Sequence, residues 1–151
     1  MQLESSDMDL RLEVATEQHR KFFWEQYADS MRVHIDKIWG WDSEWQKNDF
    51  QIRWLSCENQ LIVQGETPIG YFQTHIQPDS LYLIMFIVLP KQRNKGVGKE
   101  ALRILRANCD KPLIRMRVFE SNQKALNFYI RLGFELIEKE GGFYVLQQAV
   151  A

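Results

Sequence analysis

The stretch from residue 84 to residue 105 constrains the fold more than any other, because a buried strand, a glycine loop and a helix follow one another directly. An apolar, partly β-branched run extends from Ile84 to Leu89 and stops at Pro90, which is typical of a strand covered on both faces. Polar, basic and glycine residues follow, and apolar residues then recur at helical spacing up to Leu105. This order predicts a strand–loop–helix unit.

The loop of this unit has the features of an anion site. Gly96 and Gly98 stand at the expected helix start, where glycine lets the backbone come close to a ligand. The first N–H groups of a helix lack intrahelical partners and carry partial positive charge, and Arg93, Lys95 and Lys99 add full charges. Phosphate is the predicted ligand, although an ordinary turn with solvated charges explains the same residues. The loop fits neither G-x-x-x-x-G-K-[ST] nor G-x-G-x-x-G.

Length and composition exclude several classes of protein. The 151 residues suit one domain, and the net charge of −1 gives no electrostatic argument for a nucleic acid or membrane partner. No apolar run approaches the roughly 20 residues that span a bilayer. The two cysteines and three histidines form no metal-binding pattern, so we expect no metal, and sparse cysteine fits a cytoplasmic location. The acidic residues 1–7 do not form a signal peptide and predict a short frayed tail.

Hydrophobic periodicity and turn residues predict an α/β (α+β) fold with a mixed, mostly antiparallel sheet flanked by helices. The order is β-α-α-β-β-β-α-β-α-β-β. The predicted strands are 9–14, 59–64, 69–76, 81–89, 112–119, 134–139 and 143–148, and the predicted helices are 16–34, 42–50, 98–108 and 121–132. Only the strands on either side of helix 98–108 are expected to run parallel, with a right-handed crossover.

Two motifs resemble the signature of the GNAT acetyltransferases. Residues 93–98 fit R/Q-x-x-G-x-G/A, and residues 122–134 fit N-x-x-A-x-x-[FL]-Y-x-x-x-G-F, with one strand between them. The element order matches as well, so the resemblance covers residues 59–148 and implies a single GNAT domain over 1–151. Residues 34–45, H-I-D-K-I-W-G-W-D-S-E-W, resemble a group of bacterial acetyltransferase-like proteins.

The resemblance implies acetyl-CoA as the acetyl donor and places it along the glycine loop. Members of the family splay the third strand of the meander from the next strand, and the pantetheine arm and thioester carbonyl bind in the opening. Backbone groups would polarise that carbonyl while negative charge develops on its oxygen. The implied cofactor-binding residues are Ile87, Val88, Leu89, Arg93, Asn94, Lys95, Gly96, Val97, Gly98, Lys99 and Asn122.

The resemblance also implies that Tyr129 protonates the leaving thiolate. A phenol with a pKa near 10 suits this task only if its environment assists. Each implied role has an alternative. Tyr129 can be a packed aromatic residue, Asn122 can be only a helix cap, and Arg93 and Lys95 can be solvated loop charges.

The sequence lacks one expected group, the carboxylate that many family members place on the third meander strand as a general base. An amine must lose its proton before it attacks. The nearest candidates are Glu120, His75 and His34, and unperturbed histidine has a suitable pKa. His75 can equally be an ordinary strand histidine and Glu120 a solvated strand-end charge. A neutral amine or a water relay would need no base.

All five tryptophans lie in the first 54 residues, where the family builds one wall of its acceptor site. His34, Trp39 and Trp41 are the candidate substrate-binding residues, and Asp36, Trp45 and Trp54 are further candidates. A tryptophan face attracts cations such as an ammonium group. A place in the core or at a homodimer surface explains the same tryptophans.

The sequence therefore predicts an enzyme that transfers an acetyl group from acetyl-CoA to a primary amine by direct attack in a ternary complex. Cys109 has no base beside it in sequence, so nothing supports a covalent route. Two other functions stay open. A peptide or protein N-acetyltransferase would have an open groove, and a non-enzymatic acyl-CoA-binding module would account for the missing carboxylate.

Overall fold

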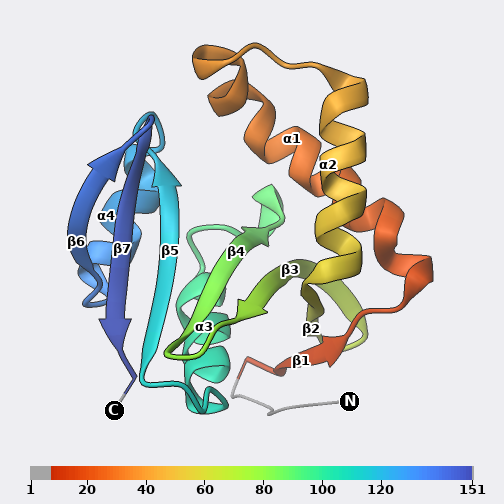
Figure 1. Ribbon diagram of the computed structural model, residues 1–151. Helices are drawn as coiled ribbons and strands as arrows, with labels where there is room; N and C mark the ends of the chain where they lie inside the picture. Colours follow the sequence, from red (N-terminus) through yellow and green to blue (C-terminus); the bar gives the residue numbers. More distant parts are fainter. Residues whose placement is uncertain (1–7, 151) are drawn as a thin grey trace.

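The computed structural model describes residues 8–150, so the predicted tail at residues 1–7 lies outside the described residues. Seven strands form one mixed sheet in the order β1-β2-β3-β4-β5-β7-β6 (Figure 1). The strands are β1 Leu10–Val14, β2 Glu58–Gln64, β3 Thr67–Ile76, β4 Ser80–Val88, β5 Leu113–Phe119, β6 Glu135–Glu140 and β7 Phe143–Ala149. The helices are α1 Arg20–Ile38, α2 Ser43–Ser56, α3 Val97–Ala107 and α4 Gln123–Arg131, with short 3₁₀ turns η1 Glu17–His19 and η2 Pro90–Gln92.

This arrangement confirms the predicted fold class and element order. β4 and β5 run parallel on either side of α3, and the other neighbouring strands are antiparallel. Asn122 caps α4, since its side-chain oxygen accepts a hydrogen bond from the Ala125 N–H. Gly133 follows α4 in the left-handed conformation (φ 95°), as the motif predicted.

Among the predicted boundaries that differ from the structure, three have a clear structural reason. α1 continues beyond His34 to Ile38 and α2 continues beyond Phe50 to Ser56, because Ile35 and Trp54 are buried and extend the contact of both helices with the sheet. β3 begins at Thr67, so Pro68 lies inside a strand. It is tolerated there because a bulge interrupts the β2–β3 pairing beside it.

Helices cover both faces of the sheet and bury a separate core on each side. The first core joins α3 and α4 to the strands and includes Leu102, Ile104 and Leu146. The second core joins α1 and α2 to the other face through Phe23 and Tyr71, whose rings stack with centroids 4.0 Å apart. Alternation along the strands divides their side chains between the two cores, as a sheet covered on both faces requires.

β4 and β5 separate halfway along their length. The strands pair only from Ser80 to Leu83, opposite Leu113 to Met116, although β4 continues to Val88 and β5 to Phe119. The separation begins at a bulge in β4, where Ile84 has no partner in the β3 register. Figure 1 shows the two strands diverging. Residues 84–86 are therefore only half-buried, which corrects the prediction of a strand fully covered on both faces.

Candidate active site

A cavity of about 820 Å³ lies where β4 and β5 separate. Its walls come from both sides of the sheet. α1, α2 and the segment between them contribute residues such as Tyr27, Trp39 and Asp49, and the α4 side contributes Asn122 and Tyr129. We call the part lined by residues 27–53 the acceptor half. The cavity therefore reaches through the sheet and is the place where two substrates from opposite faces can meet.

The glycine loop folds as an anion site requires. Asn94 and Gly96 both have left-handed backbones (φ 62° and 81°), and Gly96 is the N-cap residue directly before α3. The Glu100 N–H is the first in the helix to find its carbonyl partner, Gly96, at 3.1 Å. The N–H groups of residues 97–99 precede it and have no partner within the helix. These groups and the helix dipole favour an anion in front of them.

The side chain of Arg93 fastens this loop to the rest of the protein. Its Nε donates to the Val88 carbonyl oxygen at 2.8 Å, and its Nη2 donates to the Ser30 hydroxyl at 3.2 Å. The guanidinium thus connects the loop, the end of β4 and α1. The Arg93 side chain therefore makes contacts within the protein, and the N–H groups of residues 97–99 are the groups available to bind an anion.

Gly98 connects the loop to the cavity through two aromatic rings. A Cβ atom at Gly98 would lie 3.3 Å from the Phe128 ring and 3.6 Å from the Phe86 ring, and Phe86 lines the cavity. The helix start and the opening between the strands are therefore adjacent. Gly98 also has a packing role, because Phe128 of α4 rests against it.

The hydrogen bonds of β4 decide which of its backbone groups face the opening. The Leu89 N–H donates to the Ile69 carbonyl at 2.8 Å, so Leu89 bonds toward β3. Groups alternate along an antiparallel pair, so Ile87 also bonds toward β3, whereas Phe86 and Val88 point toward the opening. Of the three predicted residues, the structure leaves only Val88 with an available outward group, its N–H, because its carbonyl already accepts from Arg93. The structure adds the backbone of Phe86, which the sequence did not single out.

Tyr129 lies on the cavity wall beyond the opening. Its side chain is 8% exposed and packs edge-on against Phe128 and Phe134, with centroids 5.2 Å and 5.6 Å away. The phenol is protonated at neutral pH, and burial raises the pKa of Tyr129 well above its ordinary value, so the hydroxyl holds its proton more tightly than a solvated phenol does. Asn122 lines the same region of the cavity and caps α4 as well.

The three candidates for the general base differ in their position relative to the cavity. Glu120 lies outside the cavity lining and forms an ion pair with Lys139 of β6, Oε1 to Nζ 3.1 Å. His75 is exposed on β3 and does not line the cavity either. His34 stands beside the wall, where its ring stacks on Phe119 at 5.6 Å.

His34 is also held by a polar contact. Its Nδ1 lies 2.6 Å from the Ser121 hydroxyl. Burial, and to a lesser degree Lys37, lower the pKa of His34 below its ordinary value. Its imidazole is therefore neutral at pH 7 and able to accept a proton.

The tryptophans divide between the cavity and the second core. Trp39 and Trp45 line the cavity and are 61% and 60% exposed. Trp41 packs against Trp24 and Tyr27, and the buried Trp54 packs edge-on against the ring of Phe23. The structure thus places the predicted Trp39 at the site and the predicted Trp41 outside the lining. Asp36 accepts a hydrogen bond from the Trp41 N–H at 2.9 Å and does not line the cavity.

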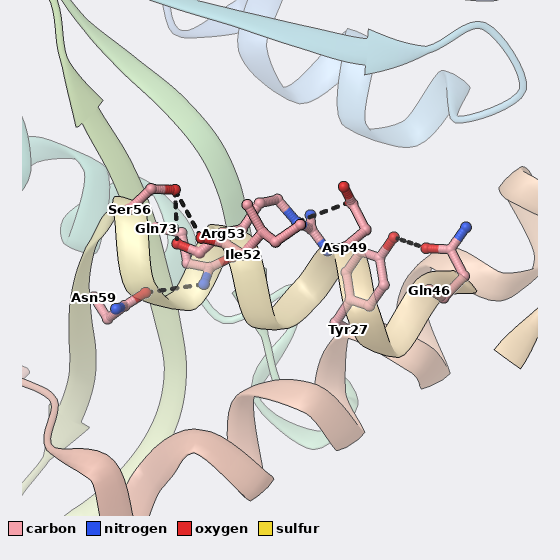
Figure 2. A network of polar contacts seen from close by, with 8 residues as sticks. All are labelled: Tyr27, Gln46, Asp49, Ile52, Arg53, Ser56, Asn59 and Gln73. Carbon is pink, nitrogen blue, oxygen red and sulfur yellow. Dashed lines mark hydrogen bonds and ion pairs between the residues drawn. The ribbon is translucent and has the colours of Figure 1, made fainter. Parts of the chain in front are cut away.

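Sequence reasoning missed a polar row on α2. Gln46, Asp49 and Arg53 recur at helical spacing and face the cavity. Figure 2 shows the Tyr27 hydroxyl donating to Gln46 Oε1 at 2.7 Å and Arg53 Nε beside Asp49 Oδ2 at 3.4 Å. The spacing from 42 to 53 could have revealed this face. Three lining residues on the strands, Tyr82, Arg117 and Phe143, had no such signal.

A mixed sheet that opens between two parallel strands, with a glycine-loop helix beside the opening, defines the acyl-CoA N-acyltransferase fold. The sequence also matches the acetyltransferase (GNAT) family model over residues 15–134. The chain therefore belongs to the GNAT acetyltransferase family, and its fold is that of enzymes that take an acetyl group from acetyl-CoA.

Solved structures agree with this assignment. An acetyltransferase from Thermus thermophilus is 18% identical, with 99% of each chain covered and a TM-score of 0.77. The PaiA N-acetyltransferase from Thermoplasma acidophilum, solved in complex with coenzyme A, is 16% identical over 94% of this chain and 99% of that chain, with a TM-score of 0.72. A GNAT-family protein from Bacteroides thetaiotaomicron is 25% identical over 91% and 86% of the two chains, with a TM-score of 0.70. No curated protein sequence matches the chain.

Two further observations concern other kinds of site. Within residues 8–150, no three histidine, cysteine, aspartate or glutamate side chains are grouped so that they could hold a metal ion. None of the helices in this range is long and apolar enough to cross a membrane.

Proposed function

We propose that this protein transfers the acetyl group of acetyl-CoA to a primary amine by direct attack while both substrates are bound. The observation that carries the proposal is the cavity through the sheet, which is lined by Tyr129 on one side and by the polar face of α2 on the other. Direct attack requires the two reactants to be held together in one site. A cavity lined by residues from both faces of the sheet provides such a site.

The residues around the opening fit acetyl-CoA. The free N–H groups at the start of α3 would hold the pyrophosphate, with Arg93 fixing the loop through Val88 and Ser30. The outward backbone groups of Phe86 and the outward N–H of Val88 would bind the pantetheine arm, and an N–H among them would polarise the thioester carbonyl. When bound, acetyl-CoA supplies an acetyl thioester as the group to be transferred.

Tyr129 would donate the proton that the departing thiolate needs. A general acid must hold its proton at the working pH and lie within reach of the leaving group. The phenol holds its proton at neutral pH, the more tightly because burial raises its pKa, and its place on the cavity wall brings it beside the opening. A thiolate that stays near the phenol in a poorly solvated site is then more basic than in water, which favours the transfer.

The acceptor amine must also lose a proton, and a group other than Tyr129 must accept it. Glu120 and His75 do not line the cavity, and Asp49 does line it but is paired with Arg53. We propose that the amine loses its proton to water in the acceptor half or binds in its neutral form. His34, neutral and beside this wall, is the protein group best placed to take the proton from that water.

Titration of acetyl-CoA into the purified protein, followed by a free-thiol assay with a panel of amines, tests this function. We expect binding and thiol release that depends on the amine. Failure to bind at millimolar acetyl-CoA would refute the proposal. Binding without release for any amine, peptides included, would favour the non-enzymatic acyl-CoA-binding module instead.

A further inference from the structure

The charges that face the acceptor half are few, and most already have partners. The two acids come from the α2 wall. The Asp42 carboxylate accepts a hydrogen bond from the Trp45 N–H at 3.1 Å and caps the helix. Asp49 lies 3.4 Å from Arg53 (Figure 2). The remaining charge that lines the cavity is Arg117.

Arg117 occupies a special position on β5. It is the first residue beyond Met116, which makes the last pair with β4. Met116 and Val118 belong to the core on the α3 and α4 side, so alternation turns Arg117 toward the face that α1 and α2 cover. An arginine therefore stands at the start of the opening, on the side from which the acceptor would enter.

The guanidinium of Arg117 stacks over the aromatic ring of Phe143. Its central carbon lies 4.3 Å from the centre of the Phe143 ring, and within residues 8–150 no carboxylate oxygen comes within ion-pair distance of it. The electrostatic effect of Arg117 on the phenol of Tyr82 shows which other residues lie beside this wall. Burial raises the pKa of Tyr82, Arg117 lowers it by a smaller amount, and Glu140 raises it. Arg117 and Glu140 of β6 therefore both lie close enough to act on the Tyr82 phenol.

The opposite wall carries a second guanidinium, that of Arg53, with one unpaired nitrogen. Arg53 Nη2 is buried without a hydrogen-bond partner, Nε makes only the 3.4 Å ion pair with Asp49, and the guanidinium is stacked 4.4 Å from the centre of the Tyr27 ring. Buried polar groups normally have partners, so a bound anion or water is the expected complement. Asp49 offsets part of the charge of Arg53, which leaves Arg117 as the stronger site for an anionic group.

We propose that the acceptor is an amine that also carries a carboxylate, such as an amino acid, and that Arg117 binds this carboxylate. The inference rests on the proposed acetyl transfer and adds the class of its acceptor. The planar guanidinium fork matches the two oxygens of a carboxylate, and stacking on Phe143 limits its freedom before binding. The neighbouring rings of Trp39, Phe119 and Phe143 would receive an apolar side chain.

Matched acceptors test the proposal. Phenylalanine, phenylalaninamide and phenethylamine share a ring and an amine but differ in the carboxylate, and leucine, leucinamide and isoamylamine form a second series. Rates of thiol release at saturating acetyl-CoA are compared per neutral amine, because the amide lowers the amine pKa. We expect kcat/KM to favour the carboxylate about 10- to 100-fold, the range for hydrogen bonds to charged groups. Aminocarboxylates with longer spacers show how far apart the two groups must lie.

Two arginine variants on β5 distinguish specific binding of the carboxylate by Arg117 from a general effect of positive charge on this strand. Arg117→Gln should remove the preference mainly through a higher KM for the acceptor, and it should leave acetyl-CoA binding unchanged. Arg115→Gln is the control. Arg115 lies two residues earlier on β5, contacts Asp79 at 3.3 Å and Gln147 at 3.1 Å, and does not line the cavity. Arg115→Gln should therefore keep the preference.

The outcomes separate this inference from the proposed function. Equal rates for the carboxylate, amide and plain amine, or a preference that survives Arg117→Gln, would overturn the inference while leaving acetyl transfer intact. If no amine releases thiol, calorimetric titration of the same six compounds decides. Carboxylate-dependent binding that Arg117→Gln abolishes supports the inference, and its absence overturns it.

Discussion

At the scale of single residues, Tyr129 offers a substitution that removes one atom and little else. Tyr129→Phe keeps the ring contacts with Phe128 and Phe134 and deletes the hydroxyl. Since general acid catalysis contributes about 10²- to 10⁴-fold, we expect kcat to fall by about that factor, with an unchanged Kd for acetyl-CoA. Thiol-release kinetics and calorimetry measure the two quantities. An unchanged kcat would mean that Tyr129 only packs.

Asn122 has two proposed roles that a pair of variants can separate. Asn122→Ala removes the side-chain cap of α4 and should lower the free energy of unfolding by about 1 kcal/mol. Asn122→Asp keeps a capping oxygen but loses the amide NH₂ group. If Asn122 binds the pantetheine arm, the aspartate variant should unfold like the wild type in urea and bind acetyl-CoA more weakly. Wild-type affinity in that variant would reduce Asn122 to a cap.

His34 should contribute to the pH dependence of stability. Its pKa is lowered in the folded protein, chiefly by burial, so the unfolded chain takes up the proton more readily. The contribution is therefore present above the ordinary pKa of about 6.5 and is lost as the pH falls below it. We expect the wild type to lose more thermal stability than His34→Gln between pH 7.5 and pH 5.5. Parallel melting curves for the two proteins would contradict this.

At the scale of elements, the start of α3 depends on the left-handed backbone of Gly96. A side chain at φ 81° costs about 1–2 kcal/mol, so Gly96→Ala should lower the free energy of unfolding by that amount and weaken acetyl-CoA binding as the loop shifts. Gly96→Asn should recover much of the loss, because asparagine tolerates this conformation. Urea denaturation and calorimetry provide the measurements.

The β6–β7 hairpin supplies the matched control for this prediction. Gly141 also has a left-handed backbone (φ 54°), and a Cβ there would meet nothing within 4 Å. Gly141→Ala should therefore show a similar loss of stability without any change in the affinity for acetyl-CoA. Equal effects of the two alanine variants on affinity would argue against a special role for the loop.

The elements that sequence could predict are those with strong local signals. Pro90 ended β4, Asn122 and Gly133 bounded α4, and Gly141 marked the last hairpin, because caps and left-handed turns depend on nearby residues alone. The true ends of α1 and α2 were missed since tertiary contacts of Ile35 and Trp54 set them. The backbone groups of Phe86 are available for binding because the β5 edge of β4 loses its partner strand there. Only the strand pairing of the folded sheet reveals this.

The acceptor half was the least predictable part for the same reason. Arg117 sits in an ordinary alternating strand, and nothing in its neighbourhood along the chain distinguishes it from Arg115. Its position becomes notable only because β4 departs after Leu83. Trp39 and Trp41 have similar sequence surroundings, yet one lines the cavity and the other packs on Trp24.

At the scale of the whole molecule, the sheet consists of two blocks joined by a short seam. β1 to β4 form one block and β5 to β7 the other, and between them only residues 80–83 pair with residues 113–116. Beyond the seam, the outward N–H groups of Phe86 and Val88 have no strand beside them. A ligand in the opening would bond these groups and connect the blocks at the far end of the seam.

This arrangement predicts where hydrogen exchange changes when acetyl-CoA binds. Exchange of the Phe86 and Val88 amides should be fast in the free protein and slow by at least tenfold with saturating acetyl-CoA, because unpaired amides exchange through small local openings. The amides of Tyr71 and Ile87, which bond within the β3–β4 pair, should change much less. The melting temperature should rise as well, since a ligand at 100 times its Kd adds about 2.7 kcal/mol. Mass spectrometry with peptides covering residues 84–89 measures the exchange, and protection confined to α3 would show that the cofactor contacts the loop but leaves the opening unfilled.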